Sequence, residues 1–253
     1  MTSTHFFRLA LSRGYQDVRG TYQRSALGPI WNVIGLTAQL LTIGTIFGIV
    51  FRTDLGTYVP FLSISLILWN SLSSTINEST GIYLAANRVI KQISLPYYFP
   101  IVQLLSKNSL FFLHNALIIL VVAAVYPQDW GWHVLLVLPG LVVLFGNLVW
   151  LSTLAAFVAT RFRDFPPAIA SLLSISFFAT PIMWMPDTLP AGLRELILTY
   201  NPFYHLMELV RAPLLGDVPQ LANWLVGLGI LVMGNTLAWL VARKLWWRVA
   251  YWL

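Results

Sequence analysis

Six long apolar stretches constrain this chain more than any other feature of its sequence. They are Ile30–Phe51, Thr57–Ile76, Pro100–Val125, Leu135–Thr160, Ala168–Met185 and Leu221–Ala242. A helix rises about 1.5 Å per residue, so roughly twenty residues cross the hydrocarbon core of a bilayer. Charged residues make up only 9% of the chain, too few to cover a water-soluble surface. The sequence therefore predicts an all-α polytopic membrane protein with six transmembrane helices.

The distribution of Lys and Arg predicts the orientation. With the N-terminus in the cytoplasm, twelve of the fifteen cations lie in cytoplasmic segments and three lie outside. The outer three are Arg52, Arg194 and Arg211. Because cations accumulate on the cytoplasmic side of membrane proteins, both termini are expected there. A signal peptide is not expected, since Arg8 interrupts the short apolar stretch His5–Leu11.

The segment before the first span, residues 1–29, has a helical pattern of its own. Its apolar residues recur at helical spacing and are Phe7, Leu11, Tyr15, Val18 and Tyr22. They predict an amphipathic helix along the cytoplasmic membrane surface. Its arginines, which can reach a lipid diphosphate or a partner protein, are Arg8, Arg13, Arg19 and Arg24. A helix that only anchors the chain remains the alternative.

Between the second and third spans lies the cytoplasmic loop Asn77–Phe99. It is longer than a simple turn requires, and it carries Arg88 and Lys91. Gly81 and two nearby prolines divide it into a short helix and an extended return, because proline cannot continue a helix. This loop is predicted to be a rigid surface against which a partner pushes.

The outer segment Pro186–Pro219 is predicted to form two half-length helices. It divides at Asn201 and Pro202, where Asn can cap a helix and Pro can begin one. The two parts, Ala191–Thr199 and Phe203–Leu215, are too short to span. Glu208 and Arg211 lie three residues apart and can pair on one helix face. We expect the two helices to dip back from the outer surface and cover an exit, with an ordinary outer hairpin as the alternative.

Several kinds of chemistry are missing from the sequence. No glycine is followed by Lys, so there is no phosphate-binding loop, and any ATP must be bound by another subunit. No Asp-x-Asp or cysteine occurs and the four histidines are scattered, so neither a metal site nor catalysis is expected. Glu78 is the one acid near a span end, which disfavours an ion-coupled carrier. The net charge of +6 follows from membrane topology, and no nucleic-acid partner is expected.

Aromatic side chains in or beside the spans are candidates to line a substrate pathway. The set is Phe47, Phe51, Trp69, Phe177, Phe178 and Trp184. Flat rings offer a large, rigid, amphipathic contact area. For each residue, packing in the core or against lipid is the alternative.

Four motifs carry a resemblance to a known family. They are Tyr22–Trp31, Thr160–Pro167, Phe178–Trp184 and Tyr200–Gly216, which extend over almost the whole chain. The chain resembles the permease subunit of ABC-2-type polysaccharide exporters, and among them most the O-antigen export permeases. Capsule and teichoic-acid exporters are near relatives of these. The resemblance implies a bacterial inner-membrane homodimer with two copies of a separate ABC ATPase, which binds the ATP and Mg²⁺. The cargo it implies is a polyprenyl-diphosphate-linked polysaccharide.

The resemblance also implies roles for particular segments. The coupling helix for the ATPase falls within Asn77–Phe99, with Glu78, Arg88 and Lys91 as candidates. The outer gate is assigned to Asn201, Pro202, Tyr204, Glu208 and Arg211. A short inner loop contains Arg161, Arg163 and Asp164, although anchoring by the arginines and helix capping by Asp164 explain it equally well. The chain is predicted to form a single domain. Residues 1–29 hold the interface helix, 30–185 the first five spans, 186–219 the outer gate helices, and 220–253 the sixth span and the cytoplasmic tail.

Other classes of function are left open by the sequence. A membrane glycosyltransferase acting on lipid-linked glycan, a scaffold that recruits a cytoplasmic protein, and an exporter of a small lipid or drug all fit a basic inner surface. A dimer is preferred over a monomer, because six spans are few for a wide pathway. Small residues such as Gly44 and Gly48 permit close helix packing, either within one bundle or between two copies.

Overall fold

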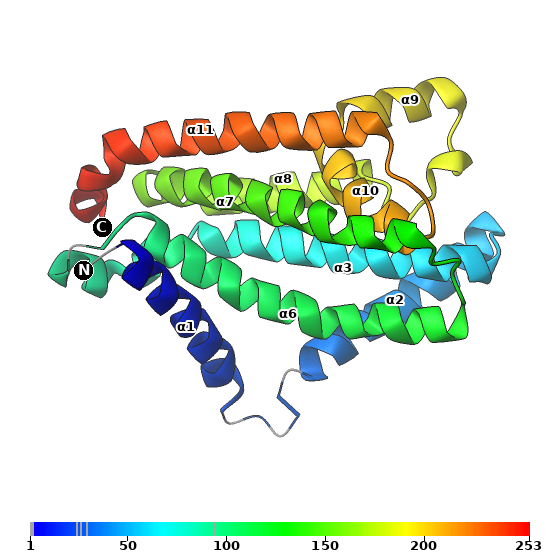
Figure 1. Ribbon diagram of the computed structural model, residues 1–253, viewed down its shortest axis with the longest axis horizontal. Helices are drawn as coiled ribbons and strands as arrows, with labels where there is room; N and C mark the ends of the chain where they lie inside the picture. The colour runs from blue at the N-terminus through cyan, green and yellow to red at the C-terminus, as the bar shows by residue number, and fades with distance from the viewer. Residues whose placement is uncertain (1–2, 24, 26, 29, 94) are drawn as a thin grey trace.

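The structure is a computed structural model that describes residues 3–253 apart from 24, 26, 29 and 94. Its long helices run side by side, with the start of α1 and the end of α11 at one end of the molecule (Figure 1). The elements are α1 (Ser3–Tyr22), α2 (Ile30–Phe51), α3 (Leu55–Ser79), α4 (Ile82–Ala85), α5 (Asn87–Gln92), α6 (Tyr98–Val125), η1 (Trp132–Leu136), α7 (Val137–Arg161), α8 (Phe165–Ala179), η2 (Pro186–Thr188), α9 (Ala191–Tyr200), α10 (Pro202–Leu214) and α11 (Leu221–Trp252). The described residues form helices and irregular segments without strands, which confirms the predicted all-α class.

Within the described residues, five helical stretches are long and apolar enough to cross a membrane. They are α2, α3, α6, the continuous η1–α7 stretch and α11. The predicted helix over Ala168–Met185 differs in its bounds, because α8 begins at Phe165 and ends at Ala179. Pro181 explains the early end, because a proline disfavours helical geometry at the residue before it. The fifteen residues of α8 rise only about 22 Å, less than a bilayer core.

The central helix of the bundle is α3. Of the residues in its most apolar 18-residue stretch, 78% are buried inside the protein. The corresponding share is 22% in both α2 and α11. Asp54 caps its start by accepting a hydrogen bond from the Thr57 amide (3.2 Å). Asn108 of α6 donates to Thr75 of α3 (3.1 Å), so the contact between these two helices includes a buried polar bond.

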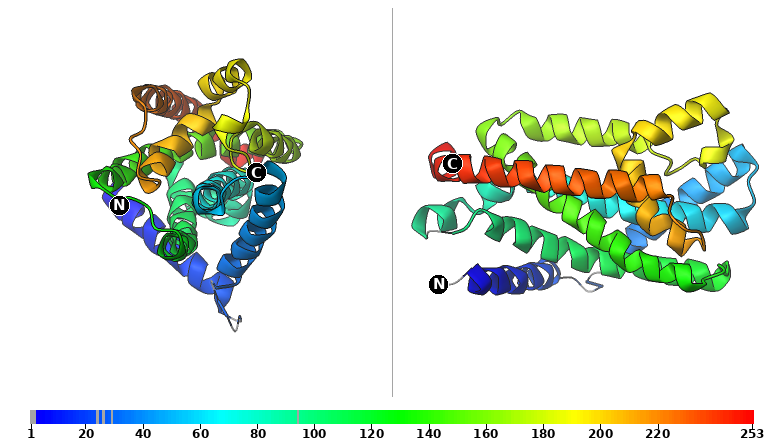
Figure 2. Two further views of the ribbon diagram at one scale, coloured as in Figure 1. Left: turned by 90° about the vertical axis from the view of Figure 1, so that its right-hand side faces the viewer. Right: turned by 45° about the horizontal axis from the view of Figure 1, so that its top comes forward.

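The N-terminal helix α1 packs obliquely against α6 (Figures 1 and 2). Small residues make the contact: a Cβ on Gly14 would lie 2.6 Å from the Gln103 carbonyl oxygen. The predicted apolar stripe points elsewhere, with Phe7, Leu11 and Tyr15 exposed. The helix is therefore confirmed, and most of the stripe faces away from the bundle, where lipid can cover it.

Helices α7 and α11 approach each other closely at glycines and are joined by hydrogen bonds from asparagine side chains. The ring of Trp150 lies over Gly234, where an added Cβ would come within 2.6 Å of the indole Cγ. Asn235 donates to the Gly146 carbonyl (3.1 Å), and Asn147 donates to the Gly227 carbonyl (3.2 Å). Close backbone approach with interhelical hydrogen bonds is a common way to stabilise helix pairs in membranes.

Candidate functional site

The segment predicted to form two half-length helices does form them, as α9 and α10, which meet at Asn201. The Asn201 side-chain oxygen accepts from the Tyr204 amide (3.1 Å), and Pro202 begins the helix. The two helices differ in burial. Every residue of α9 is exposed or half-buried, whereas eight of the thirteen residues of α10 are buried. Only α10 inserts into the bundle, and α9 stays on the surface.

Two glycines allow α10 to approach the bundle. A Cβ on Gly140 of α7 would collide with the Leu209 carbonyl oxygen and lie 2.9 Å from its carbon. A Cβ on Gly227 of α11 would lie 2.9 Å from the Leu209 side chain. These distances are shorter than van der Waals contact. These two glycines therefore make room for α10.

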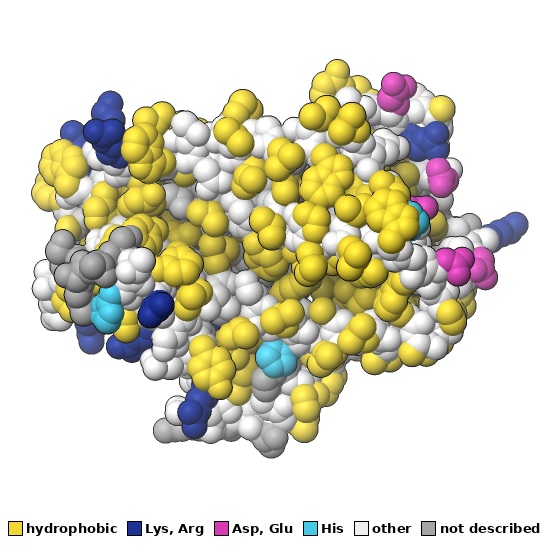
Figure 3. All heavy atoms as spheres, viewed as in Figure 1, with side chains coloured by type: hydrophobic (Ala, Val, Ile, Leu, Met, Phe, Trp, Pro, Cys, Tyr) yellow, Lys and Arg dark blue, Asp and Glu magenta, His cyan; other side chains and the backbone are white. Residues whose placement is uncertain are grey.

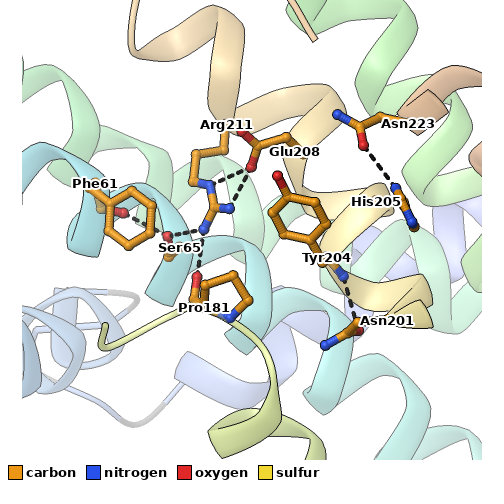
Figure 4. A network of polar contacts seen from close by, with 9 residues as sticks. All are labelled: Phe61, Ser65, Pro181, Asn201, Tyr204, His205, Glu208, Arg211 and Asn223. Carbon is orange, nitrogen blue, oxygen red and sulfur yellow. Dashed lines mark hydrogen bonds and ion pairs between the residues drawn. The ribbon is translucent and has the colours of Figure 1, made fainter. Parts of the chain in front are cut away.

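Arg211 of α10 is the largest fully buried side chain in the described part of the chain. Its guanidinium donates to the Glu208 carboxylate (Nε to Oε2, 2.8 Å), so the predicted pair is confirmed. It also donates to the Ser65 hydroxyl of α3 (3.0 Å) and to the Pro181 carbonyl after α8 (2.6 Å) (Figure 4). The ring of Phe61 lies 4.4 Å from the guanidinium carbon. Such pairing offsets the cost of burying a charge, and it joins α10 to two other elements.

His205 is a second buried polar residue of α10, and the sequence interpretation did not single it out. Its ring nitrogens lie 2.8 Å from the Asn223 side-chain oxygen and 3.1 Å from the Thr199 carbonyl. The ring thereby links α10 to the end of α9 and to the start of α11, and Figure 4 shows its contact with Asn223. The sequence offers little signal for it, because a single histidine shows no spacing that would identify its distant partners.

At the opposite end, the loop between α3 and α6 folds into two short helices, α4 and α5, rather than the single predicted one. Arg88 and Lys91 are exposed on α5. Glu78, placed with them by sequence, instead forms an ion pair with Lys107 of α6. Lys107 is held by this pair. The structure therefore separates Glu78 from the two exposed cations.

The remaining predicted cations lie on the surface of the same end. Arg8, Arg13 and Arg19 are exposed along α1, and Arg24 lies outside the described residues. Residues 161, 163 and 164, the predicted inner loop, are all exposed. Asp164 stands at the N-cap position of α8, but its side chain makes no capping hydrogen bond within the described chain. The alternative prediction that the Asp164 side chain caps this helix is therefore wrong.

The aromatic candidates occupy different environments. Trp69 is 7% exposed and contacts Phe177 (ring centroids 5.9 Å apart) and Phe203 (5.5 Å). Phe178 is 63% exposed, and its carbonyl accepts a hydrogen bond from the half-buried Trp184 indole (3.1 Å). Phe47 is also half-buried, and the Phe51 side chain lies outside the described ones. Trp69 therefore packs in the core, whereas Phe178 presents a free ring surface.

Five helical stretches of the described chain are long and apolar enough to cross a membrane, which indicates a multi-pass membrane protein. The chain belongs to the ABC-2 type transporter family, whose model matches residues 7–215. It is similar to the O-antigen export system permease protein RfbA of Myxococcus xanthus, 23% identical over 81% of this chain and 79% of that protein. A permease of the same name from Klebsiella pneumoniae is 28% identical over 78% of this chain and 76% of the relative.

Proposed function

We propose that this chain is the permease subunit of an ATP-driven exporter that moves lipid-linked polysaccharide of the O-antigen type across the bacterial inner membrane. The observation that carries the proposal is the similarity to O-antigen export permeases over about four fifths of the chain. The ATP-binding subunit is a separate ABC ATPase, since the sequence has no phosphate-binding loop. The exposed helix α5 contacts that ATPase, and the buried helix α10 closes the outer end.

The charge distribution supports the proposed orientation. Figure 3 shows most Lys and Arg side chains at the end that holds the two termini, and Asp and Glu side chains at the opposite end. Cations accumulate on the cytoplasmic side of inner-membrane proteins. Both termini, α5 and the arginines of α1 therefore face the cytoplasm, where Arg8, Arg13 and Arg19 meet the diphosphate of the lipid carrier.

Two copies of the chain form the pathway in this proposal. The surface of α8 supports it: Leu173 is buried, and its other residues are exposed or half-buried. A helix so little covered by its own chain is free to pack against a second copy. Phe178 on that surface would then lie beside the pathway, where it offers sugars an apolar face.

The function is tested by deleting the gene in a cell that displays a long surface glycan. The proposal predicts loss of surface glycan and accumulation of lipid-linked polymer on the cytoplasmic side, both reversed by the intact chain. Full-length surface glycan in the deleted cells would contradict the proposal. A block before polymer synthesis would instead indicate a transferase.

Reversing the charge of α5 is expected to stop coupling. The double variant Arg88→Glu, Lys91→Glu should lower export and stimulated ATP hydrolysis roughly tenfold or more, because like charges across an interface cost several kcal/mol. Arg248→Glu, another exposed cation near the same end, is the control and should leave both rates unchanged. Both rates are measured in membranes containing the two subunits. Normal export by the double variant would exclude α5 as the ATPase contact.

Removing the exposed ring of Phe178 is expected to slow export with little loss of stability. The ring is 63% exposed and makes an edge contact with Phe177 (5.3 Å between centroids), so Phe178→Ala removes little packing. Trp69→Ala is the contrasting variant: it empties a buried position and should destabilise the chain by about 3–5 kcal/mol. Export rates and thermal unfolding in detergent separate the two effects. An unchanged export rate in Phe178→Ala would remove this residue from the pathway.

A further inference from the structure

Helix α5 is held by contacts on both sides of it in the chain. Its own residues are all exposed or half-buried. Before α5, Tyr83 of α4 is fully buried, and its ring contacts Phe157 of α7 (5.3 Å between centroids) and Trp246 of α11 (5.4 Å). The Tyr83 hydroxyl donates to the Tyr97 carbonyl (3.2 Å). Burial raises the pKa of Tyr83, so this hydroxyl stays neutral and keeps its proton.

After α5, the chain is attached to α11. The Trp246 indole donates to the Leu95 carbonyl (3.1 Å), and its ring also contacts Tyr97 (6.4 Å) and Phe157 (6.3 Å). We call Tyr83, Tyr97, Phe157 and Trp246 the cytoplasmic aromatic cluster. Ile101 of α6 packs into it as well. A displacement of α5 therefore reaches α7 and α11 directly, because close-packed side chains transmit strain.

The same two helices hold α10 at the outer end. Leu209 of α10 lies between Gly140 of α7 and Gly227 of α11, with no room for a Cβ on either. Between the two ends, α7 and α11 pack along each other (Figure 1). Their contact includes the Asn235–Gly146 and Asn147–Gly227 hydrogen bonds. One pair of helices thus connects the cytoplasmic aromatic cluster to the buried outer helix.

We propose that α7 and α11 move as one unit that transmits motion of α5 to α10, and that the cytoplasmic aromatic cluster is the contact through which the unit is driven. The inference rests on the proposed function, in which an ATPase acts on α5. It identifies the residues of the cytoplasmic aromatic cluster, which lie far from α10, as positioning residues for that helix. Trp246 is the residue most important to the linkage, because its ring and indole N–H contact both flanks of α5.

A single cysteine reports on α10. The native chain has no cysteine, so Ala212→Cys introduces the sole thiol at a position that is 4% exposed. The complex with its ABC ATPase is treated with a water-soluble maleimide, with and without ATP. ATP is expected to raise the labelling rate several-fold by moving α10. In Ala212→Cys, Trp246→Ala this rise should be lost while ATP hydrolysis continues.

Trp247→Ala is the matched control, because Trp247 is adjacent in sequence but 71% exposed and bonded only within its own helix (to the Lys244 carbonyl, 3.0 Å) among the described contacts. It should keep the full response to ATP. Trp246→Phe retains a ring without the N–H donor and should show an intermediate response, which serves as the test if the alanine variant does not insert.

The outcomes separate this inference from the function on which it rests. A full ATP response in both Trp246 variants would overturn the linkage alone. Equal loss in the Trp246 and Trp247 variants would also overturn it, since the effect would then be general. If Ala212→Cys without further changes shows no response to ATP, the proposed ATP-driven function is itself contradicted.

Discussion

Replacing Arg211 with Ala is expected to release α10 from the bundle and abolish export. The change leaves the Glu208 carboxylate without its partner and removes the donor to Ser65 and Pro181. Breaking a buried ion pair costs about 3–5 kcal/mol, because an unpaired charge remains in a low-dielectric site. Thermal unfolding in detergent should therefore begin at a clearly lower temperature, and polymer export should fall to background.

Arg194→Ala is the control for this variant. Arg194 pairs with Asp187 (2.7 Å) on the outer surface, where both side chains are accessible to water. Exposed pairs contribute about 0–1 kcal/mol, so stability and export should be nearly unchanged. An Arg211→Ala chain as stable and active as the Arg194→Ala chain would show that the buried network does not hold α10.

Replacing Gly140 with Ala is expected to displace α10 by overpacking. The new methyl group would collide with the Leu209 carbonyl, and a backbone group cannot rotate away as a side chain does. Overpacking of this kind costs about 1–3 kcal/mol or more. A thiol at Ala212→Cys should become labelled faster even without ATP, and export should be lost or uncoupled from ATP hydrolysis.

Gly229→Ala provides the matched change. On α11, a Cβ at Gly229 would meet no described atom within 4 Å. Alanine also favours a helix over glycine by about 1 kcal/mol, so this variant should be neutral or slightly stabilised. If Gly140→Ala and Gly229→Ala behave alike in unfolding and in thiol labelling, close packing at Gly140 is not what positions α10.

The outer helices show which features of the site can be predicted from sequence. The Asn201 cap and the Glu208–Arg211 pair were predicted because both depend on residues within one turn of each other. The partners of Arg211 on α3 and after α8 were not predicted, since hydrophobic periodicity carries no information about which helix faces which. The depth of α10 depends on the glycines of two other helices, and this too is a tertiary property.

The end of the molecule that holds α4 and α5 shows the same division. The arginines and the loop length indicated an exposed surface, and Arg88 and Lys91 are indeed exposed. Glu78 was grouped with them by sequence distance, yet Lys107 on another helix binds it. The cytoplasmic aromatic cluster went unnoticed because its rings come from four separate elements. The end of α8 was misplaced because Pro181 was treated as part of an apolar run, although proline disfavours helix at the preceding residue.

The most direct test of the account is transport in proteoliposomes that contain this chain, with or without a purified ABC ATPase subunit, and lipid-linked polysaccharide on the outside of inverted vesicles. We predict that ATP hydrolysis appears only when the ATPase is present, and that polymer becomes protected inside the vesicles only when both subunits and ATP are supplied. ATP hydrolysis or sugar transfer by the chain alone, or equal protection of the polymer without the chain, would contradict the account.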